Sequence, residues 1–523
     1  MRERNVHQAE LKPALASRLR IEKRSGAAFQ HYRIKPPRPL TEPEKRRVTL
    51  LFGGATWKHE RLMQGAMERL GYKAEPLPQI LHRDLLAGKD YIDAGACCPT
   101  AFTAGSLINY LRQAVAELGP QRVVRDYVFV TAGGCGPCRF GQYQESYSLA
   151  LEGIGLPDFR VLLLDLKGIG PGSFETTVPF TLGVFWAFMC GDVLTELEYM
   201  TRPYEIEPGE TDRVVRECVE LLYGAIRNGP DTGGRYRTVL CYLGTGHYRR
   251  TLARVLRKFS AIRVDRLQVK PKVKVTGEFW LQAHEGDGNY RIKQWLESEG
   301  AEVIPPVYTA WCDFLIQARR DRAWERRGTV PRARAVALYL VVLSRLLHRA
   351  YNGLRASLSN LPAALPSQTE LQRLAAPYYH YRLEGGESYC LIGKALHAYR
   401  NRTAHMICEL SPYGCLPNTM SMGAMAGVLR HYPDLLYAPI EIKGDAEVQA
   451  LSRCQMNLTE AHRRARTEFE QALRRFDLTP ERIREHERDD PALCRADTRI
   501  PHHGYAGTAA NYVAEVAARL GGR

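Results

Sequence analysis

Short apolar runs in this chain end in glycine-rich turns, and segments with apolar side chains at helical spacing follow them. Residues 48–52 form such a run, which stops at Gly53-Gly54, and residues 59–70 have a helical pattern. Residues 126–131 and 159–165 repeat the strand pattern. This alternation of strand, turn and helix is typical of a mostly parallel sheet. The pattern therefore predicts an α/β fold.

The pattern also divides the chain into four regions. We predict a basic N-terminal arm (1–47), a first α/β lobe with a helical insertion at 175–230 (48–267), a second α/β lobe (268–476) and a C-terminal surface tail (477–523). In the second lobe we expect strands at 273–282, 303–305, 404–410 and 435–442, and helices at 291–299, 311–320, 333–356, 387–401 and 445–476.

Composition is that of a soluble protein. The 523 residues are 45% hydrophobic and 25% charged, and the longest apolar candidate, 335–347, is shorter than the ~20 residues that span a bilayer. The first residues are polar and lack the apolar segment of a signal peptide. We expect a cytoplasmic protein that does not enter a membrane.

The net charge of +16 is concentrated in part at the N-terminus. Residues 1–47 hold 13 Lys and Arg against 5 Asp and Glu, a surplus of 13 − 5 = +8. Such an arm can bind nucleic acid or an acidic partner, or lie over the protein's own surface. No zinc-finger spacing or RNA-binding aromatic motif is present, which makes a nucleic-acid role the weaker interpretation.

Thirteen cysteines in a long chain without a secretion signal favour metal binding or redox chemistry over disulfides. Three of them, Cys97, Cys138 and Cys415, lie in Gly/Pro turns, and the last two follow apolar strand-like runs. Ligands commonly bind at such turns in open α/β sheets. Backbone N–H groups in these turns can hydrogen-bond thiolate sulfur, so three converging thiolates could hold a [4Fe–4S] cluster with one iron left open.

Two other interpretations of the cysteines stay open. Cys135-Gly136-Pro137-Cys138 follows a strand and precedes a helix, as in dithiol–disulfide oxidoreductases. That chemistry leaves Cys97 and Cys415 without a role. A structural zinc site would need a fourth ligand, which Cys135 or Cys98 could supply.

The same turns resemble motifs of the 2-hydroxyacyl-CoA dehydratase family, most closely the dehydratase-like portion of its large activase-type proteins. Three segments carry the resemblance: Ala96-Cys97-Cys98-Pro99-Thr100 with Gly105, then Cys138-Arg139 with Tyr143 and Tyr147, and Pro412-Tyr413-Gly414-Cys415-Leu416-Pro417-Asn418. Supporting matches are Gly277-Glu278-Phe279, the stretch 296–303 and Gly386-Glu387. Together they cover roughly residues 48–460.

The resemblance implies two Rossmann-like lobes with a [4Fe–4S] cluster between them, held here by Cys97, Cys138 and Cys415. It also implies low-potential electron transfer from a separate ATP-hydrolysing activator to an acyl-CoA. This chain has no ATPase portion of the activator type, so its electrons would come from another chain. Some relatives hold a double-cubane [8Fe–9S] cluster on six thiolates and reduce small molecules, and Cys98, Cys135 and Cys408 would make six here.

Two further groups are weaker candidates. Gly244, Gly246 and Arg249 lie where a strand would meet a helix and could bind a CoA phosphate, or form a plain turn. His284 and Glu285 follow a predicted strand and could act as acid and base, or simply belong to a helix-capping turn. A non-catalytic electron-transfer or scaffold subunit is a further alternative, and a homodimer and a heterodimer both stay open.

Overall fold

The computed structural model describes residues 37–133, 138–164, 173–174, 177–229, 247–383 and 385–521. Cys135, Gly244, Gly246, the strand predicted near residues 236–243 and most of the basic arm lie outside these residues. The described part of the arm contains α2 (Glu42–Arg47). Glu44 of this helix accepts hydrogen bonds from Arg38 and Arg160, which attaches the segment to the first lobe.

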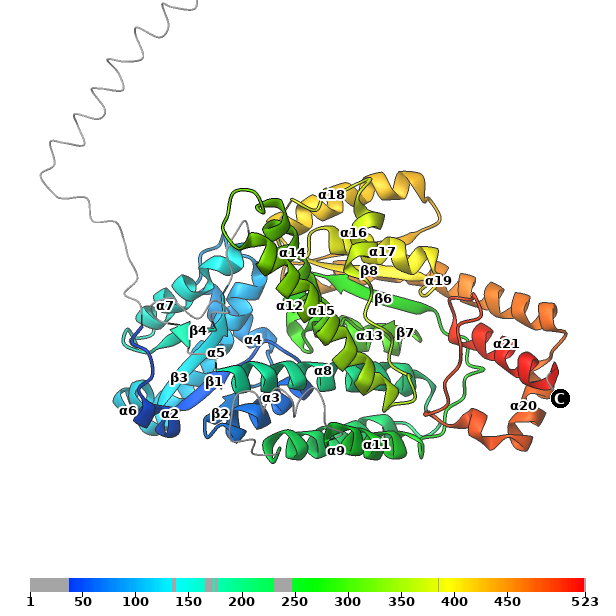
Figure 1. Cartoon of the computed structure of the whole chain (residues 1–523), viewed down its shortest axis with the longest axis horizontal. Helices are drawn as coiled ribbons and strands as arrows, with labels where there is room; N and C mark the ends of the chain where they lie inside the picture. Colours follow the sequence, from blue (N-terminus) through cyan, green and yellow to red (C-terminus); the bar gives the residue numbers. More distant parts are fainter. Residues whose placement is uncertain are drawn as a thin grey trace, which may run out of the picture. The chain divides into compact units, whose positions relative to one another are not determined.

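The first lobe contains a parallel sheet with the strand order β2-β1-β3-β4-β5 (Figure 1). Its strands are β1 (Thr49–Phe52), β2 (Lys73–Pro76), β3 (Tyr127–Ala132), β4 (Val161–Leu164) and β5 (Ser173–Phe174). Parallel neighbours require crossover connections. These are formed by α3 (Trp57–Arg69), α4 (His82–Lys89), α5 (Cys98–Leu118), α6 (Pro120–Asp126) and α7 (Tyr143–Gly153).

The second lobe repeats this plan in the order β7-β6-β8-β9, again all parallel. Its strands are β6 (Lys272–Gly277), β7 (Glu302–Ile304), β8 (Met406–Pro412) and β9 (Leu436–Ile442). Its helices include α12 (Phe279–Ala283), α13 (Ile292–Ser298), α17 (Tyr389–Arg400), α18 (Leu416–His431) and α19 (Glu447–Phe476). Every residue of β8 is buried, as expected of a central strand covered on both faces. The predicted α/β fold with two lobes is confirmed.

In both sheets the second strand along the chain lies on one side of the first strand, and the later strands lie on its other side. The switch lies between β1 and β3 in one lobe and between β6 and β8 in the other. Open α/β sheets bind ligands at this point, beyond the carboxyl ends of the strands. Two equivalent binding edges are therefore available in this chain.

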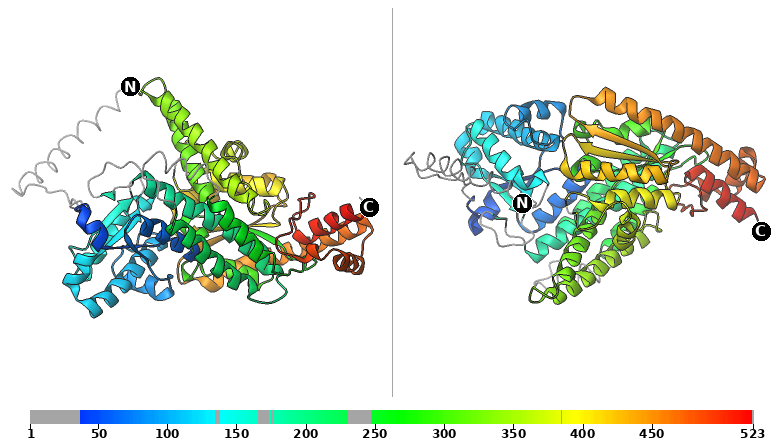
Figure 2. Two further views of the ribbon diagram at one scale, coloured as in Figure 1. Left: turned by 60° about the horizontal axis from the view of Figure 1, so that its bottom comes forward. Right: turned by 90° about the horizontal axis from the view of Figure 1, so that it is seen from above.

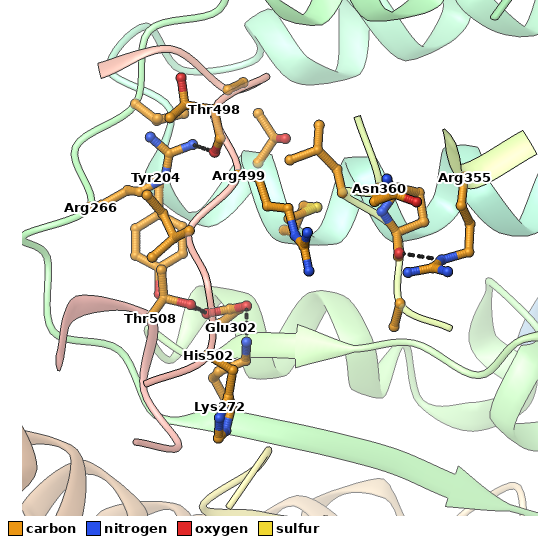
Figure 3. A pocket seen from close by; sticks show the side chains of 18 of the residues that line it. Tyr204, Arg266, Lys272, Glu302, Arg355, Asn360, Thr498, Arg499, His502 and Thr508 are labelled. Atoms are coloured by element: carbon orange, nitrogen blue, oxygen red, sulfur yellow. Dashed lines mark hydrogen bonds and ion pairs between the residues drawn. The ribbon is translucent and has the colours of Figure 1, made fainter. Parts of the chain in front are cut away.

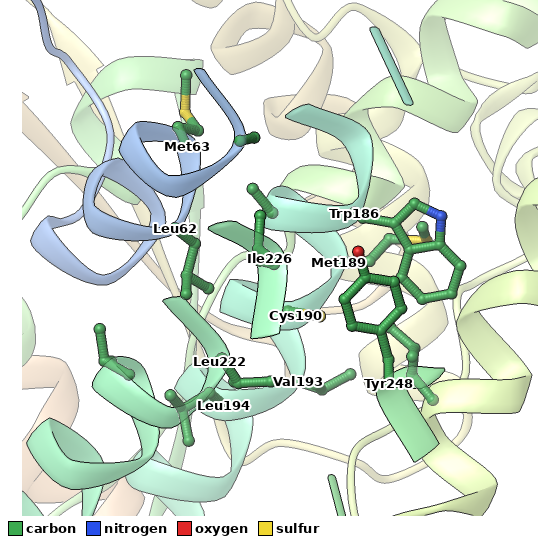
Figure 4. Close-up of a cluster of buried hydrophobic side chains, with 14 of the residues drawn as sticks. Leu62, Met63, Trp186, Met189, Cys190, Val193, Leu194, Leu222, Ile226 and Tyr248 are labelled. Carbon is green, nitrogen blue, oxygen red and sulfur yellow. The ribbon is translucent and has the colours of Figure 1, made fainter. Parts of the chain in front are cut away.

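A helical layer of α8 (Val178–Thr201), α9 (Glu210–Arg227) and α11 (His247–Phe259) packs beside the first sheet. Figure 4 shows its core, where side chains of α8 and α9 meet α3, and Trp186 stacks on Tyr248 of α11 with ring centroids 4.8 Å apart. The segment Val178–Tyr204 is long and apolar enough to cross a membrane, but 61% of its apolar window is buried within the protein. It is thus a longer apolar run than the predicted 335–347, and it serves as a core helix.

The connection between β7 and β8 contains α14 (Tyr308–Glu325), α15 (Ala333–Ala356) and α16 (Gln368–Ala375). The predicted helix at 333–356 has the bounds of α15. The predicted loop around Pro362–Pro377 contains α16, which begins at the N-cap Ser367 and buries Leu371 and Leu374 against α17. The prolines on both sides of this short helix made the sequence pattern resemble that of a loop.

The segment expected to be a surface tail is instead folded. It forms α20 (Pro480–Asp489) and α21 (Thr508–Gly521), and Figure 2 shows α19 extending from the second sheet to these helices. Ile483, Leu493, Tyr512 and Val516 are fully or almost fully buried in a core shared with α19. Because α20 has many charged residues, the sequence pattern did not reveal the apolar position, Ile483, that packs in this core.

Strand β6 ends five residues earlier than predicted, because Gly277 has a φ of +130° and approaches the backbone of Leu410 too closely for any side chain. Glu278 then caps α12 by accepting a hydrogen bond from Leu281 N at 2.9 Å. The turn directs Glu278 to the carboxyl edge of the sheet, which the sequence pattern did not indicate.

Gly105 provides a test of the close packing of α4 on α5. A Cβ at this position would overlap the carbonyl oxygen of Asp84, and backbone cannot move aside as a flexible side chain can. We expect Gly105→Ala to lower the free energy of unfolding by about 3 kcal/mol. Gly423→Ala is the matched control, since α18 leaves open space there and alanine should stabilise by up to about 1 kcal/mol. Urea unfolding of both variants measures this, and equal effects would contradict the packing.

Candidate metal centre

The predicted cysteine turns lie at the carboxyl edges of the two sheets. Cys138 follows β3 and Cys415 follows β8, so each belongs to a strand that borders a switch point. Glu278 follows β6, the other strand at the switch point of the second sheet. The expectation that Cys138 and Cys415 follow strands is confirmed.

Two of the three cysteines are also helix N-caps. Cys97 precedes α5 and Cys415 precedes α18, and both are less than one tenth exposed. Cys138 stands before the short 3₁₀ turn η1 (Arg139–Gln142). The amino ends of the 21-residue α5 and the 16-residue α18 carry positive potential, which attracts negatively charged groups.

Cys97 has two hydroxyl neighbours. Its sulfur lies 3.2 Å from Tyr143 Oη and 3.3 Å from Thr100 Oγ1. Thr100 belongs to the cysteine's own turn, whereas Tyr143 comes from α7, beyond the second cysteine turn. When Cys97 is a thiolate, both hydroxyls can donate to it and stabilise its charge.

Arg139 links the cysteine turns to one another, and Asn418 holds the third turn to the end of β8. Arg139 Nη1 donates to the carbonyl oxygen of Gly95, in the first turn, and lies close to Gly414, in the third. Asn418 Oδ1 lies 3.6 Å from the sulfur of Cys415, and its amide reaches back to Leu410 O at the end of β8. Segments from both lobes therefore meet at this edge.

Burial and neighbouring charges raise the pKa values of three thiols of the centre. Burial raises the pKa of Cys138 to about 11, and the charge of Cys97 adds to the rise. Burial also raises the pKa of Cys415, with a contribution from Cys138, and that of Cys98, with contributions from Cys97 and Cys415.

Two glutamates lie in the same neighbourhood. The charges of Glu278 and Glu387 each contribute to the raised pKa values of Cys138 and Cys415. Glu387 is 2% exposed, and neither of its carboxyl oxygens has a hydrogen-bond partner among the residues described. Removal from water raises the pKa of Glu278 and, to a larger extent, that of Glu387. Both glutamates belong to motifs identified in the sequence, Gly277-Glu278-Phe279 and Gly386-Glu387, but the sequence pattern indicated no role for them.

Cys98 and Cys408, the additional candidate ligands that the structure describes, lie in different environments. Cys98 belongs to the centre, where its sulfur donates to Ile442 O at the end of β9 at 3.2 Å. Cys408 instead lies within β8, fully buried in the hydrophobic core, and its thiol is hydrogen-bonded to Cys454 of α19. Alternation along a strand directs Cys408 into that core, so it is not a candidate ligand.

His284 and Glu285 occupy a different environment from the thiols. Both are buried, and His284 stacks on Trp280 with ring centroids 4.5 Å apart. Glu285 Oε1 pairs with Lys58 Nζ at 2.8 Å, and Lys58 also pairs with Glu198 at 2.7 Å. Despite burial, which opposes it, the charge of Lys58 lowers the pKa of Glu285 to about 2. Glu285 is therefore a partner in a buried ion pair between the lobes.

Arg249 is the described member of the candidate phosphate turn. It is exposed on the first turn of α11, while Gly244 and Gly246 lie outside the described residues. The proposed contact between these glycines and a CoA phosphate stays a prediction.

The donor set fits an iron–sulfur cluster. Cys97, Cys138, Cys415 and the neighbouring Cys98 are free cysteines, and their soft sulfur atoms are the ligand type that iron–sulfur clusters take. Within the part of the chain that the structure describes, no group of three or more His, Cys, Asp or Glu side chains is arranged to hold a metal ion. The thiolates of a cluster bind different iron atoms, so they need not converge on one point as the ligands of a single ion do.

Comparison with known proteins adds no assignment, since no family model and no curated protein matches this chain. The interpretation of the centre therefore depends on its residues and their geometry.

Glu285→Gln tests whether this residue is structural. Loss of its charge leaves buried Lys58 with one carboxylate, and we expect unfolding free energy at neutral pH to fall by about 3 kcal/mol. Because the folded-state pKa of Glu285 is depressed, its contribution is present above pH 4.5 and is lost as the pH falls through about 2. The difference in unfolding free energy between parent and variant should therefore disappear over that pH range, as measured by urea unfolding at each pH. Exposed Glu207→Gln is the control, and a fully stable Glu285→Gln would contradict the structural role.

Proposed function

We propose that this chain is an iron–sulfur protein of the 2-hydroxyacyl-CoA dehydratase type, in which Cys97, Cys138 and Cys415 hold a [4Fe–4S] cluster. The observation that supports the proposal is that Arg139, beside Cys138, contacts Gly95 in the first cysteine turn and approaches Gly414 in the third, at the carboxyl edges of two parallel sheets. The three cysteine motifs that resemble the family lie at this same edge.

When bound, such a cluster supplies single-electron transfer at low potential. The protein's own groups would set its environment. Tyr143 and Thr100 would donate hydrogen bonds to the sulfur of Cys97, which tunes reduction potential. Glu387, whose pKa is raised by burial, would hold a proton on its carboxyl group near Cys138 and Cys415. Loss of water from a hydroxyacyl substrate needs such a proton donor.

The proposed reaction needs an electron donor and a substrate. A separate ATP-dependent activator would supply the electron, and an acyl-CoA or another small molecule would accept it. Exposed Tyr413, Leu416 and Met420 flank the third cysteine turn and provide an apolar surface for such an approach. Oxygen-sensitive chemistry of this kind, with reduced cysteines, fits the cytoplasm.

The first test is the iron content of cysteine variants purified without oxygen. The parent should contain about four iron and four sulfide per chain. Cys97→Ala, Cys138→Ala and Cys415→Ala should each retain less than about one quarter of this, because each removes a thiolate ligand. Iron and acid-labile sulfide assays measure the outcome.

Cys218→Ala is the matched control, because Cys218 is fully buried in α9, within the helical layer, and should not affect iron. A parent without iron would overturn the proposal. If that parent formed a reversible disulfide between Cys135 and Cys138, dithiol chemistry would take its place.

Cys408→Ala distinguishes a three-thiolate cluster from a six-thiolate one. Cys408 contacts Cys454 in the core of the second lobe, so the variant should keep the parent's iron and sulfide content. A loss of more than about half of the iron in a variant that still unfolds cooperatively would instead favour the [8Fe–9S] arrangement.

A further inference from the structure

A cavity of about 360 Å³ lies at the end of the second sheet opposite to the cysteine turns (Figure 3). Lys272 and Glu302, the first residues of β6 and β7, form part of its wall. Residues 360–364 and the C-terminal segment before α21 form other parts. Six residues of β6 at about 3.3 Å each separate this cavity from the candidate metal centre by roughly 20 Å.

The wall of the cavity is strongly cationic. Four permanently charged side chains line it, from four separate segments of the chain: Arg266, Lys272, Arg355 and Arg499. Glu302 is the one acidic residue among the lining residues that the structure describes, which leaves a surplus of 4 − 1 = +3. His502 would add to this charge when protonated.

The carboxylate of Glu302 already has partners within the protein. Glu302 pairs with Lys272 Nζ at 2.9 Å. It also accepts hydrogen bonds from Tyr204 Oη at 2.8 Å and from Thr508 Oγ1 at 2.5 Å. It therefore neutralises Lys272 and leaves the three arginines without a carboxylate from the cavity wall.

Arg266 is held by neutral groups. It is 8% exposed and donates to the carbonyl oxygens of Leu493, Arg495 and Thr498 at 2.7, 2.8 and 3.1 Å. Carbonyl groups orient a guanidinium but do not cancel its charge, and burial lowers the pKa of Arg266 accordingly. An anion in the cavity would offset this cost.

Arg499 is the cation without a partner. Figure 3 shows its side chain between Arg266 and Arg355, and it makes no hydrogen bond or ion pair with any residue that the structure describes. Arg355 is bound through its Nε to Pro362 O at 2.8 Å, again a neutral acceptor. Guanidinium groups in such positions are well suited to bidentate contacts with phosphate oxygens.

We propose that this cavity binds a small phosphorylated ligand, through Arg499 together with Arg266 and Arg355. Its volume is that of a small-molecule site. The ring of Tyr204 is 1% exposed and its hydroxyl is engaged by Glu302, so this side chain offers no stacking surface to a ligand. The arginines would carry recognition, through the phosphate groups of the ligand. The site is independent of the proposed iron–sulfur function.

Titration calorimetry with inorganic pyrophosphate tests the proposal on the full chain. The parent should bind one pyrophosphate saturably, and orthophosphate at least about tenfold more weakly because it carries less charge. Arg499→Glu should weaken pyrophosphate binding by about a hundredfold or more, since it replaces an attraction with a repulsion. Arg499 is exposed, so thermal unfolding should show that the variant remains folded.

Arg488→Glu is the matched control, because it makes the same change of charge on exposed α20 outside the cavity wall. Unchanged affinity in this control, with the loss in Arg499→Glu, supports the site. The proposal is overturned if the parent does not bind pyrophosphate, if Arg488→Glu weakens binding as much as Arg499→Glu, or if Arg499→Glu binds as the parent does. Binding of citrate as tightly as pyrophosphate would also overturn the assignment to phosphate.

Discussion

The buried ion pairs of Lys58 determine how the two lobes face each other. This lysine, near the start of α3, binds Glu285 of the second lobe and Glu198 of α8, and all three side chains are almost completely removed from water. Charges buried in this way lose hydration and are tolerated only in a geometry that keeps them paired. Next to them, Trp280 contacts Phe102 and lies against Gly54, so apolar packing supports the same arrangement. The carboxyl edges of both sheets are thereby brought to one place.

Convergence of the edges explains the chemistry that we propose for the centre. Each lobe contributes a cysteine that follows a central strand along the chain, and Cys97 joins them from the amino end of α5. Helix amino ends and hydroxyl groups stabilise anionic sulfur, while burial opposes it until a metal supplies the compensating charge. The opposite end of the second sheet has a different character, with unneutralised arginines around a cavity. One fold thus presents a thiol-rich edge and a cationic edge.

Much of this fold follows from local sequence patterns. Apolar runs that stop at glycine predicted the central strands, and the periodicity of residues 333–356 gave the bounds of α15. Elements stabilised by distant packing were missed or misjudged: α16 between prolines, α20 and α21 on α19, and the early end of β6 at Gly277. The pairing of Lys58 with Glu285 spans 227 residues, and no local pattern encodes it. Likewise, spacing could not distinguish Cys98, at the centre, from Cys408, which lies within a strand and points into the core.

The proposed function requires Cys97, Cys138 and Cys415 to bind one cluster jointly. The decisive measurement is an EPR spectrum of the anaerobically purified protein after reduction with dithionite. We expect the signal of a reduced [4Fe–4S] cluster, integrating to about one spin per chain and absent from a variant that lacks Cys415. A silent spectrum from folded, iron-replete protein, or an unchanged signal after Cys415 is replaced, would contradict it.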